Sequence, residues 1–215
     1  MNGLAGKHVL VTAGGTREPL DSVRFLGNRS SGRMGVALAA EARRRGAEVT
    51  LVASNLTVEP PEGVEVVEAP TAADVEREVT VRADADVILM AGAVADYRPA
   101  VALRDKRPKD GNPWTVELEP TVDVLRALGK RRRNGQLLVG FGADHGEKGL
   151  ERKRGMLTDK GVDLVVYNDV SRDDTGFEAA DNEVVLVSPD GDQRIPKAPK
   201  EQIAREILDA VERLA

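Results

Sequence analysis

The chain contains no cysteine and few other residues suited to holding a transition metal. Without cysteine, neither a disulfide framework nor a cysteine-ligated metal site can form. Two histidines, His8 and His145, are too few for a histidine-rich metal cluster. We expect His8 to be structural and His145 to lie in a solvated loop unless it touches a ligand. The sequence thus leaves the residues of any metal site unknown.

Long apolar segments and an excess of positive charge are also missing. No apolar run reaches the ~18 residues needed to span a membrane, and the first residues lack the apolar core of a signal peptide. The net charge of −5 argues against nucleic-acid binding through a basic face. We therefore expect a cytoplasmic protein that binds neither membranes nor nucleic acid.

Aromatic residues are scarce, at 3% of the chain, so the core must be built from valine, leucine and alanine. The 215 residues suit one α/β domain over residues 1–215. Apolar runs alternate with helical patterns through the first half. The expected strands are 7–13, 48–54, 64–67 and 85–91, and the expected helices are 34–45 and 72–82, the latter capped by Thr71. This rhythm predicts a Rossmann-like, doubly wound, mostly parallel sheet with ligands at the carboxyl edge of its strands.

The second half interrupts this rhythm once and then resumes it. Residues 99–120 contain four prolines together with Lys106, Lys109 and Gly111, which predicts a flap or hairpin that leaves the sheet edge. After it we expect a helix from Thr121, as its cap, to Lys130, strands at 136–141 and 162–167, a helix at 149–160, a hairpin of 182–187 with 192–195, and a closing helix at 201–214.

Residues 11–35 carry the most informative pattern. The first strand ends at Gly14 and Gly15. Their backbone N–H groups could point at a phosphate, or the two glycines could simply allow a tight turn. The spacing is not the G-x-G-x-x-G of dinucleotide sites, and the second strand ends at Ser54 and Asn55 without the acidic residue that holds a ribose. The loop therefore favours a phosphate-bearing ligand other than NAD.

Basic and amide side chains surround the start of the next helix. Arg24, Arg29 and Arg33 exceed what helix capping requires, and arginine makes paired hydrogen bonds to phosphate or carboxylate. Ser30 and Ser31 could cap the helix, and the helix start is also an anion site. The neutral amide of Asn28 could stabilise a developing oxyanion without itself titrating.

A second loop follows the apolar run 85–91. It reads Ala91-Gly92-Ala93-Val94-Ala95-Asp96-Tyr97-Arg98-Pro99, and its small residues allow a ligand to lie against the backbone. Asp96 could orient a ribose or base, or it could pair with Arg98. Both loops are expected to open at the same edge of the sheet.

These loops, together with Lys106-Arg107-Pro108-Lys109, Gly140-Phe141 and Tyr167-Asn168-Asp169-Val170-Ser171, occur in a fixed order. The chain resembles the bacterial phosphopantothenoylcysteine synthetases (phosphopantothenate–cysteine ligases) of coenzyme A biosynthesis, from about residue 6 to its end. Asn-x-Ser-Ser-Gly-x-Met-Gly and Ala-Val-Ala-Asp-Tyr-Arg are the specific motifs.

The resemblance implies a CTP-dependent ligation accompanied by Mg²⁺. The carboxylate of 4′-phosphopantothenate attacks CTP, an acyl-cytidylate forms, and the amine of cysteine displaces CMP. The resemblance also implies a homodimer with residues 99–120 as dimerisation flap, and many relatives carry a flavin-dependent decarboxylase as a further domain or partner.

The resemblance assigns residues to roles. Catalytic roles fall to Asn28 and Lys106. Substrate contacts fall to Arg24, Ser30, Ser31, Gly32 and Ala93. Nucleotide contacts fall to Gly14, Gly15, Ala91, Gly92, Asp96, Lys106, Asp123, Phe141 and Lys160.

Two other functions stay open. The sheet and glycine turn also suit an NAD(P)-dependent reductase of the short-chain type, although neither Tyr97 nor Tyr167 has the lysine four residues on that such enzymes use. The chain also departs from the family pattern at Arg107-Pro108 and at Met156, where relatives often have lysine. A nucleotide-binding paralogue without turnover, or a preference for ATP over CTP, would fit these departures.

Overall fold

The structure is a computed structural model that describes residues 3–171 and 181–215. The strands are β1 (His8–Gly14), β2 (Arg17–Pro19), β3 (Phe25–Gly27), β4 (Glu48–Ser54), β5 (Glu65–Glu68), β6 (Val87–Met90), β7 (Tyr97–Pro99), β8 (Leu118–Pro120), β9 (Leu137–Asp144), β10 (Leu164–Asp169), β11 (Asp181–Ser188) and β12 (Gly191–Pro199). The helices are α1 (Arg33–Arg44), α2 (Ala72–Val81), α3 (Val124–Arg131), α4 (Gly146–Arg154), α5 (Met156–Asp159) and α6 (Lys200–Leu214). No helix in the described part of the chain is long and apolar enough to cross a bilayer.

Eight strands form the central sheet in the order β12-β11-β10-β9-β6-β1-β4-β5. The strands from β5 to β10 pair in parallel, and β11 and β12 extend this sheet as an antiparallel hairpin. The doubly wound, mostly parallel sheet is confirmed. From the central pair, β1 connects outward to β4 through α1, and β6 connects the other way to β9 through α3. The junction of β1 and β6 is therefore the topological switch point, where ligands bind in such sheets.

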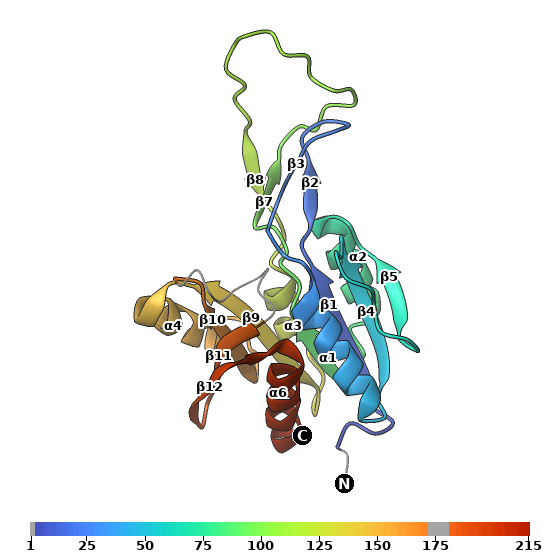
Figure 1. Ribbon diagram of the computed structural model, residues 1–215, viewed down its shortest axis with the longest axis vertical. Coiled ribbons are helices and arrows are strands. Elements are labelled where there is room, and N and C mark those ends of the chain that lie inside the picture. The colour runs from blue at the N-terminus through green and yellow to red at the C-terminus, as the bar shows by residue number, and fades with distance from the viewer. Residues whose placement is uncertain (1–2, 172–180) are drawn as a thin grey trace.

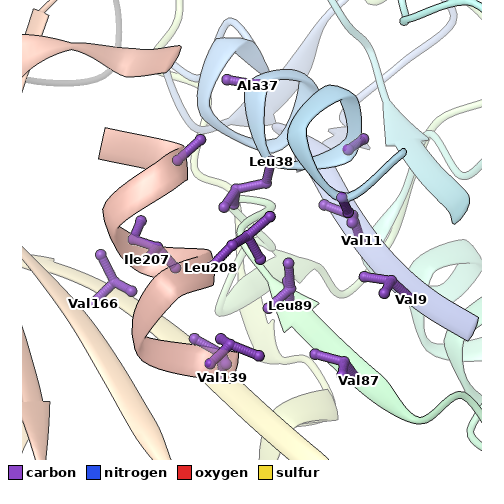
Figure 2. Close-up of a cluster of buried hydrophobic side chains, with 14 of the residues drawn as sticks. Val9, Val11, Ala37, Leu38, Val87, Leu89, Val139, Val166, Ile207 and Leu208 are labelled. Carbon is purple, nitrogen blue, oxygen red and sulfur yellow. The ribbon is translucent and has the colours of Figure 1, made fainter. Parts of the chain in front are cut away.

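Aliphatic side chains cover both faces of the sheet, as the scarcity of aromatics predicts. Helices α1 and α6 pack on one face, and α2, α3 and α4 pack on the other. Figure 2 shows the first of these cores, in which Leu38 of α1 and Ile207 and Leu208 of α6 meet strand residues such as Val11 and Leu89. The two layers hold the carboxyl ends of the strands in fixed positions.

A charged network ties α1 to α6 beneath this core. Arg45, which is only 7% exposed, contacts Glu41 at 2.8 Å, Asp209 at 2.8 Å and Glu212 at 2.9 Å. Arg44 also donates to Glu41, and this hydrogen bond together with that from Arg45 holds the pKa of Glu41 below its ordinary value, although burial acts in the opposite direction. The network fixes the two helices side by side, with both helix starts at the carboxyl edge of the sheet.

The predicted hairpin that leaves the sheet is present, but a second hairpin lies beside it, and the sequence analysis did not predict this second one. Strands β7 and β8 form a two-stranded sheet, and a second hairpin of β2 and β3 extends beside it (Figure 1). We call residues 17–27 and 97–120 together the arm. It projects away from the central sheet.

The tip of the arm is organised by Asp21. Its buried carboxylate accepts hydrogen bonds from the backbone N–H groups of Val23, Arg24 and Arg107 and forms an ion pair with Arg24 at 3.0 Å. The guanidinium groups of Arg24 and Arg107 both lie over the ring of Trp114. These contacts join the two hairpins into one unit.

Two helix boundaries differ from expectation, and one is confirmed. Thr71 caps α2 through a complete capping box, as predicted. Helix α3 is capped by Asp123 rather than by Thr121, whose hydroxyl instead donates to the carbonyl of Ala95. The helix expected at 149–160 begins earlier and is divided at Gly155 into α4 and α5.

Candidate functional site

A cavity of about 650 Å³ opens at the carboxyl edge of the sheet, over the ends of β6, β9, β10 and β11. It is lined by residues 28–35, 90–96, 121–125 and 141–145, and by Lys153, Met156, Lys160, Val166, Asn168, Val170, Asn182, Val184 and Lys200. The two loops that we expected to meet do meet here. The cavity therefore lies where the doubly wound topology predicts a ligand site.

Most residues predicted for the site line this cavity. They are Asn28, Ser30, Ser31, Gly32, Ala91, Gly92, Ala93, Asp96, Asp123, Phe141 and Lys160. Four predicted residues do not line it, namely Gly14, Gly15, Arg24 and Lys106. The first two contact the lining residue Ala93, and the last two lie in the arm.

Gly14 and Gly15 serve the packing of the two loops. The N–H of Ala93 donates to the carbonyl of Gly14 at 2.7 Å, and Gly15 forms a bridge with Ala93. A Cβ atom at Gly15 would approach the Asn28 carbonyl to 2.8 Å, and one at Gly14 would overlap the carbonyl of Ser54. The glycine pair therefore lets the Asn28 loop lie close to the first strand, and its predicted phosphate contact stays a prediction.

Asn28 follows β3 and reaches across to the β6 loop. Its side-chain nitrogen lies 3.3 Å from the carbonyl oxygen of Ala93 and 3.5 Å from that of Val94. Both contacts are long, and the residue is exposed toward the cavity. An amide held this loosely can turn its donor toward a ligand without breaking a buried hydrogen bond.

The start of α1 is not capped by a serine. Its N-cap is Gly32, in the left-handed conformation with φ of 84°, and no side chain caps it. Ser31 accepts from the N–H of Arg33 only at the long distance of 3.5 Å, and Ser30 lines the cavity without capping the helix. The expected capping role of Ser30 and Ser31 is therefore wrong, and the first turn presents backbone N–H groups of the kind that bind anions.

Basic side chains lie at the α3/α5 end of the cavity. Lys160 forms an ion pair with Asp123 at 3.2 Å, and Lys153, which the sequence analysis did not single out, lies 3.8 Å from Asp144. Burial would raise the pKa of Asp123, but the N–H of Arg126 and the ammonium of Lys160 outweigh it and hold that pKa below its ordinary value. Asp123 therefore stays ionised and holds Lys160 in place through the ion pair.

Asp144 is held in a similar way at the rim. Arg152 binds it through two nitrogens at 2.6 and 3.0 Å, and the N–H of His145 donates to it at 2.8 Å. These donors, Arg152 first, keep the pKa of Asp144 far below its ordinary value. His145 is exposed at the start of α4 and lines the cavity, whereas His8 lies at the start of β1 and bonds Thr50.

The sequence analysis left two roles open for Asp96, contact with a ligand or pairing with Arg98, and the arm shows how Arg98 is paired. Arg98 pairs with Glu119 at 2.7 Å, so it does not neutralise Asp96. Asp96 is exposed and lines the cavity, and its backbone carbonyl accepts from Thr121. Its side chain is available to orient a hydroxyl or amine of a ligand.

Among the described residues that line the cavity, Asp96, Asp123 and Asp144 carry the carboxylates. No group of three or more histidine or acidic residues that could enclose a metal ion occurs in the described residues. A metal ion that arrives with a nucleotide needs no such protein cage, because phosphate oxygens and water supply most of its ligands.

Comparisons with known proteins place this geometry in context. The model of the family described as DNA/pantothenate metabolism flavoprotein C-terminal domain matches residues 4–214. Coenzyme A biosynthesis bifunctional proteins CoaBC are 42% identical in Mycobacterium tuberculosis, over 97% of this chain, and 39% identical in Bacillus subtilis, over 99%. The chain spans 52% of each, so it corresponds to about half the length of these relatives.

A solved structure has the same fold. The crystal structure of the C-terminal domain of a coenzyme A biosynthesis bifunctional protein CoaBC matches with a TM-score of 0.83 and 36% identity. The match covers 100% of this chain and 98% of that one.

Proposed function

The chain belongs to the DNA/pantothenate metabolism flavoprotein C-terminal domain family, and from this membership we propose that it ligates 4′-phosphopantothenate to cysteine with CTP. The curated relatives that it resembles act in coenzyme A biosynthesis as bifunctional proteins, and the chain spans about half of each. The observation that carries the proposal is that the Asn28 amide and the basic pair Lys153 and Lys160 line one and the same cavity.

The reaction balances without a protein nucleophile. A carboxylate oxygen of phosphopantothenate attacks the α-phosphorus of CTP, and pyrophosphate leaves to give an acyl-cytidylate. The amine of cysteine then attacks the acyl carbon, CMP leaves with the electron pair of the broken C–O bond, and the amine proton passes to solvent. Such chemistry depends on positioning and charge stabilisation, and the cavity residues supply amides and cations for both.

Asn28 is the residue that we assign to the second step. Its amide nitrogen can donate to the oxyanion that forms as cysteine attacks the acyl carbon. Its present acceptors, Ala93 and Val94, are backbone carbonyls at long distance, so this donor can be given up.

We assign the nucleotide to the end of the cavity that is lined by Lys153, Lys160 and Asp123. The two lysines would neutralise phosphate charge, and Mg²⁺ would accompany the triphosphate on phosphate oxygens and water. Phe141 and Asp96 would contact the base and ribose. The absence of an acidic residue at the end of β4, where Ser54 instead bonds the carbonyl of Ala69, supports a mononucleotide over NAD.

We also propose that the arm is a dimerisation element. It gathers exposed apolar side chains, namely Val23, Phe25, Leu26, Tyr97, Val101, Leu103 and Leu118. Exposed apolar surface of this extent is typical of protein–protein contacts. Arg24 and Lys106 lie in the same arm and do not line the cavity of their own chain. In a dimer the arm would bring them to the partner's cavity.

Mixing two inactive variants tests that arrangement. Asn28→Ala removes a cavity residue and Lys106→Ala removes an arm residue. If the arm serves the partner's cavity, unfolding and refolding the two variants together restores a fraction of the wild-type rate, because each mixed dimer has one intact site. Activity that stays absent in the mixture shows that Lys106 acts within its own chain.

The activity itself is tested by release of pyrophosphate and CMP. Both products should appear only when phosphopantothenate, cysteine, CTP and Mg²⁺ are all present, and replacing CTP by ATP measures the nucleotide preference. Absence of CMP under these conditions refutes the ligase. CTP binding without turnover would then identify a nucleotide-binding paralogue, and NADPH binding would favour a reductase.

A further inference from the structure

The turn that follows Asn28 has Arg29 at its apex. The backbone N–H of Ser30 donates to the carbonyl of Asn28 at 2.9 Å, and such a hydrogen bond between residues two apart forms a γ-turn centred on Arg29. The backbone on either side packs against Gly15, because a Cβ atom built there would lie 2.8 Å from the carbonyl oxygen of Asn28 and 3.3 Å from Cβ of Ser30. The main chain of Arg29 is therefore held in place by its neighbours.

The side chain of Arg29 carries a charge that is not paired within the described part of the chain. It is exposed and lines the cavity, and it forms no hydrogen bond or ion pair with another described residue. Lys153 and Lys160 line the same cavity, but each lies beside an aspartate, Asp144 and Asp123 respectively. An anionic ligand can therefore pair with the guanidinium of Arg29 without first breaking an ion pair of the protein.

A second arginine lines the cavity but stands elsewhere. Arg33 is the first residue of α1, beyond the left-handed turn at Gly32. Burial lowers the pKa of Lys200, and the charge of Arg33 lowers it further, so Arg33 acts near the start of α6. Arg29 instead adjoins Asn28 in the chain, with Cα atoms about 3.8 Å apart. Of the two arginines, Arg29 is the one that adjoins the amide to which we assign the attack of cysteine.

Cysteine brings a negative charge to this part of the cavity. Its carboxylate and its attacking amine are attached to the same carbon, so the carboxylate comes close to Asn28 when the amine reaches the acyl carbon. The acyl-cytidylate already carries two phosphate groups, which repel an incoming carboxylate unless a cation offsets the repulsion. A guanidinium group suits this task, because its planar N–H groups match the two oxygens of a carboxylate.

We propose that Arg29 binds the α-carboxylate of cysteine and so sets the preference for cysteine over amines that lack a carboxylate. The proposal rests on the proposed function, because the position of the carboxylate follows from that of the acyl carbon beside Asn28. One turn of the chain then serves the second step twice. Asn28 donates to the oxyanion, and Arg29 holds the amino acid whose amine attacks. Arg29 has no part in the first step, in which cysteine does not react.

Turnover with cysteine and with cysteamine, followed by release of CMP, tests the proposal. Cysteamine has the amine and thiol of cysteine but no carboxylate. The wild-type protein should prefer cysteine by about tenfold or more in kcat/KM. Arg29→Met should raise the KM for cysteine by about tenfold to a hundredfold, the value of a hydrogen bond to a charged group, and should leave kcat/KM for cysteamine within about twofold. Arg29→Lys should retain part of the preference.

Two further measurements separate this role from a general loss of activity. In Arg29→Met the acyl-cytidylate, followed by rapid quenching, should form at the wild-type rate, accumulate at low cysteine concentration and be consumed at high concentration. Arg33→Met removes the other arginine of the cavity lining and should leave the preference for cysteine over cysteamine within about twofold. Arg205→Met, at an exposed position of α6 that does not line the cavity, is the control for loss of one surface arginine.

An unchanged KM for cysteine in Arg29→Met overturns the proposal, as does a rise confined to the KM of phosphopantothenate or CTP. Equal kcat/KM of the wild-type protein for cysteine and cysteamine overturns it as well. In each of these cases CMP is still released, so the ligase stands and only the role of Arg29 is lost. Absence of CMP release by the wild-type protein refutes the ligase and the proposal together, so the two failures are distinguishable.

Discussion

The side-chain nitrogen of Asn28 lies 3.3 Å from the carbonyl oxygen of Ala93, which joins the end of the arm's first hairpin to the loop at the switch point. The two residues are 65 positions apart in the sequence. The contact depends on the glycine pair beneath it, since Gly15 forms a bridge with Ala93 and packs against the backbone of Asn28. Backbone packing thereby places the amide at the wall of the cavity.

Replacement of Asn28 should slow the second half of the reaction. In Asn28→Ala the oxyanion loses a donor, and in Asn28→Asp it meets a negative charge, so we expect turnover to fall by about a hundredfold or more. The acyl-cytidylate should accumulate and can be followed by rapid quenching and chromatography. Asn134→Ala, in an exposed loop, is the control. Full turnover by Asn28→Ala would remove Asn28 from the mechanism.

Gly14 should tolerate no side chain. Its φ of 88° is left-handed, and a Cβ atom there would overlap the Ser54 carbonyl. Gly14→Ala should therefore destabilise the protein by more than about 2 kcal/mol. Gly135→Ala is the matched control, because Gly135 has a φ of 78° but nothing within 4 Å of an added Cβ. Its cost should be only about 1 kcal/mol, from backbone conformation alone. Urea denaturation measures the free energy of unfolding of both variants. Equal losses of stability would contradict a steric overlap at Gly14.

The sheet could be predicted from the sequence because its signals are local. The apolar run at 85–91 and the alternation of strands with helices identify the parallel strands without reference to the rest of the chain. The parallel order then places the loops after β1 and β6 at one edge. For this reason Asn28 and Asp96 could be assigned to one site, and both line the cavity.

The remaining features depend on contacts that are distant in sequence. The hairpin of β2 and β3 has strands of three residues with no apolar alternation, and its Glu18 is buried because it accepts from the N–H of Ala72 at the start of α2. Helix α6 packs against α1, which lies far from it in the sequence. Neither partner can be inferred from the local pattern.

The network between α1 and α6 should make stability depend on acid pH. The pKa of Glu41 is lower in the folded protein than in the unfolded chain, chiefly through the hydrogen bond from Arg44. Its contribution is therefore complete above about pH 4.3, the ordinary pKa of glutamate, and is lost as the pH falls through the lower folded value. Glu41→Gln should cost about 2 kcal/mol at pH 7, because it removes one of the three carboxylates that pair with the buried Arg45 and weakens a hydrogen bond to a charged group.

The same variant should respond less to acid. Between about pH 5 and pH 3, the stability of Glu41→Gln should fall less steeply than that of the wild-type protein. Glu62→Gln, at an exposed position, is the control for loss of one carboxylate. Parallel pH profiles for Glu41→Gln and the wild-type protein would exclude Glu41 as a source of the pH dependence.

Asp21 should stabilise the arm without contributing much to the stability of the central sheet. Asp21→Ala removes the acceptor of three backbone N–H groups and the ion pair to Arg24, all of them within the arm. We expect faster cleavage by trypsin after Lys106 and a nearly unchanged thermal midpoint, because local opening is separable from global unfolding. A large fall in the thermal midpoint would show that the arm and the sheet unfold together.

The apolar surface of the arm should determine the oligomeric state. Val101 is 73% exposed in the arm, and Val81 is 72% exposed at the end of α2, so the two valines differ in location and not in exposure. If two arms pack against each other, Val101→Asp places an uncompensated charge in an apolar interface and should weaken the dimer by about tenfold or more, whereas Val81→Asp should leave it intact. Sedimentation equilibrium of both variants at matched concentration measures the difference in dimer affinity.

Because the proposed site draws Lys106 from the partner, activity should fall in parallel with the dimer fraction of Val101→Asp and recover at high protein concentration. A monomeric wild-type protein, or equal effects of the two substitutions, would reject the arm as the interface.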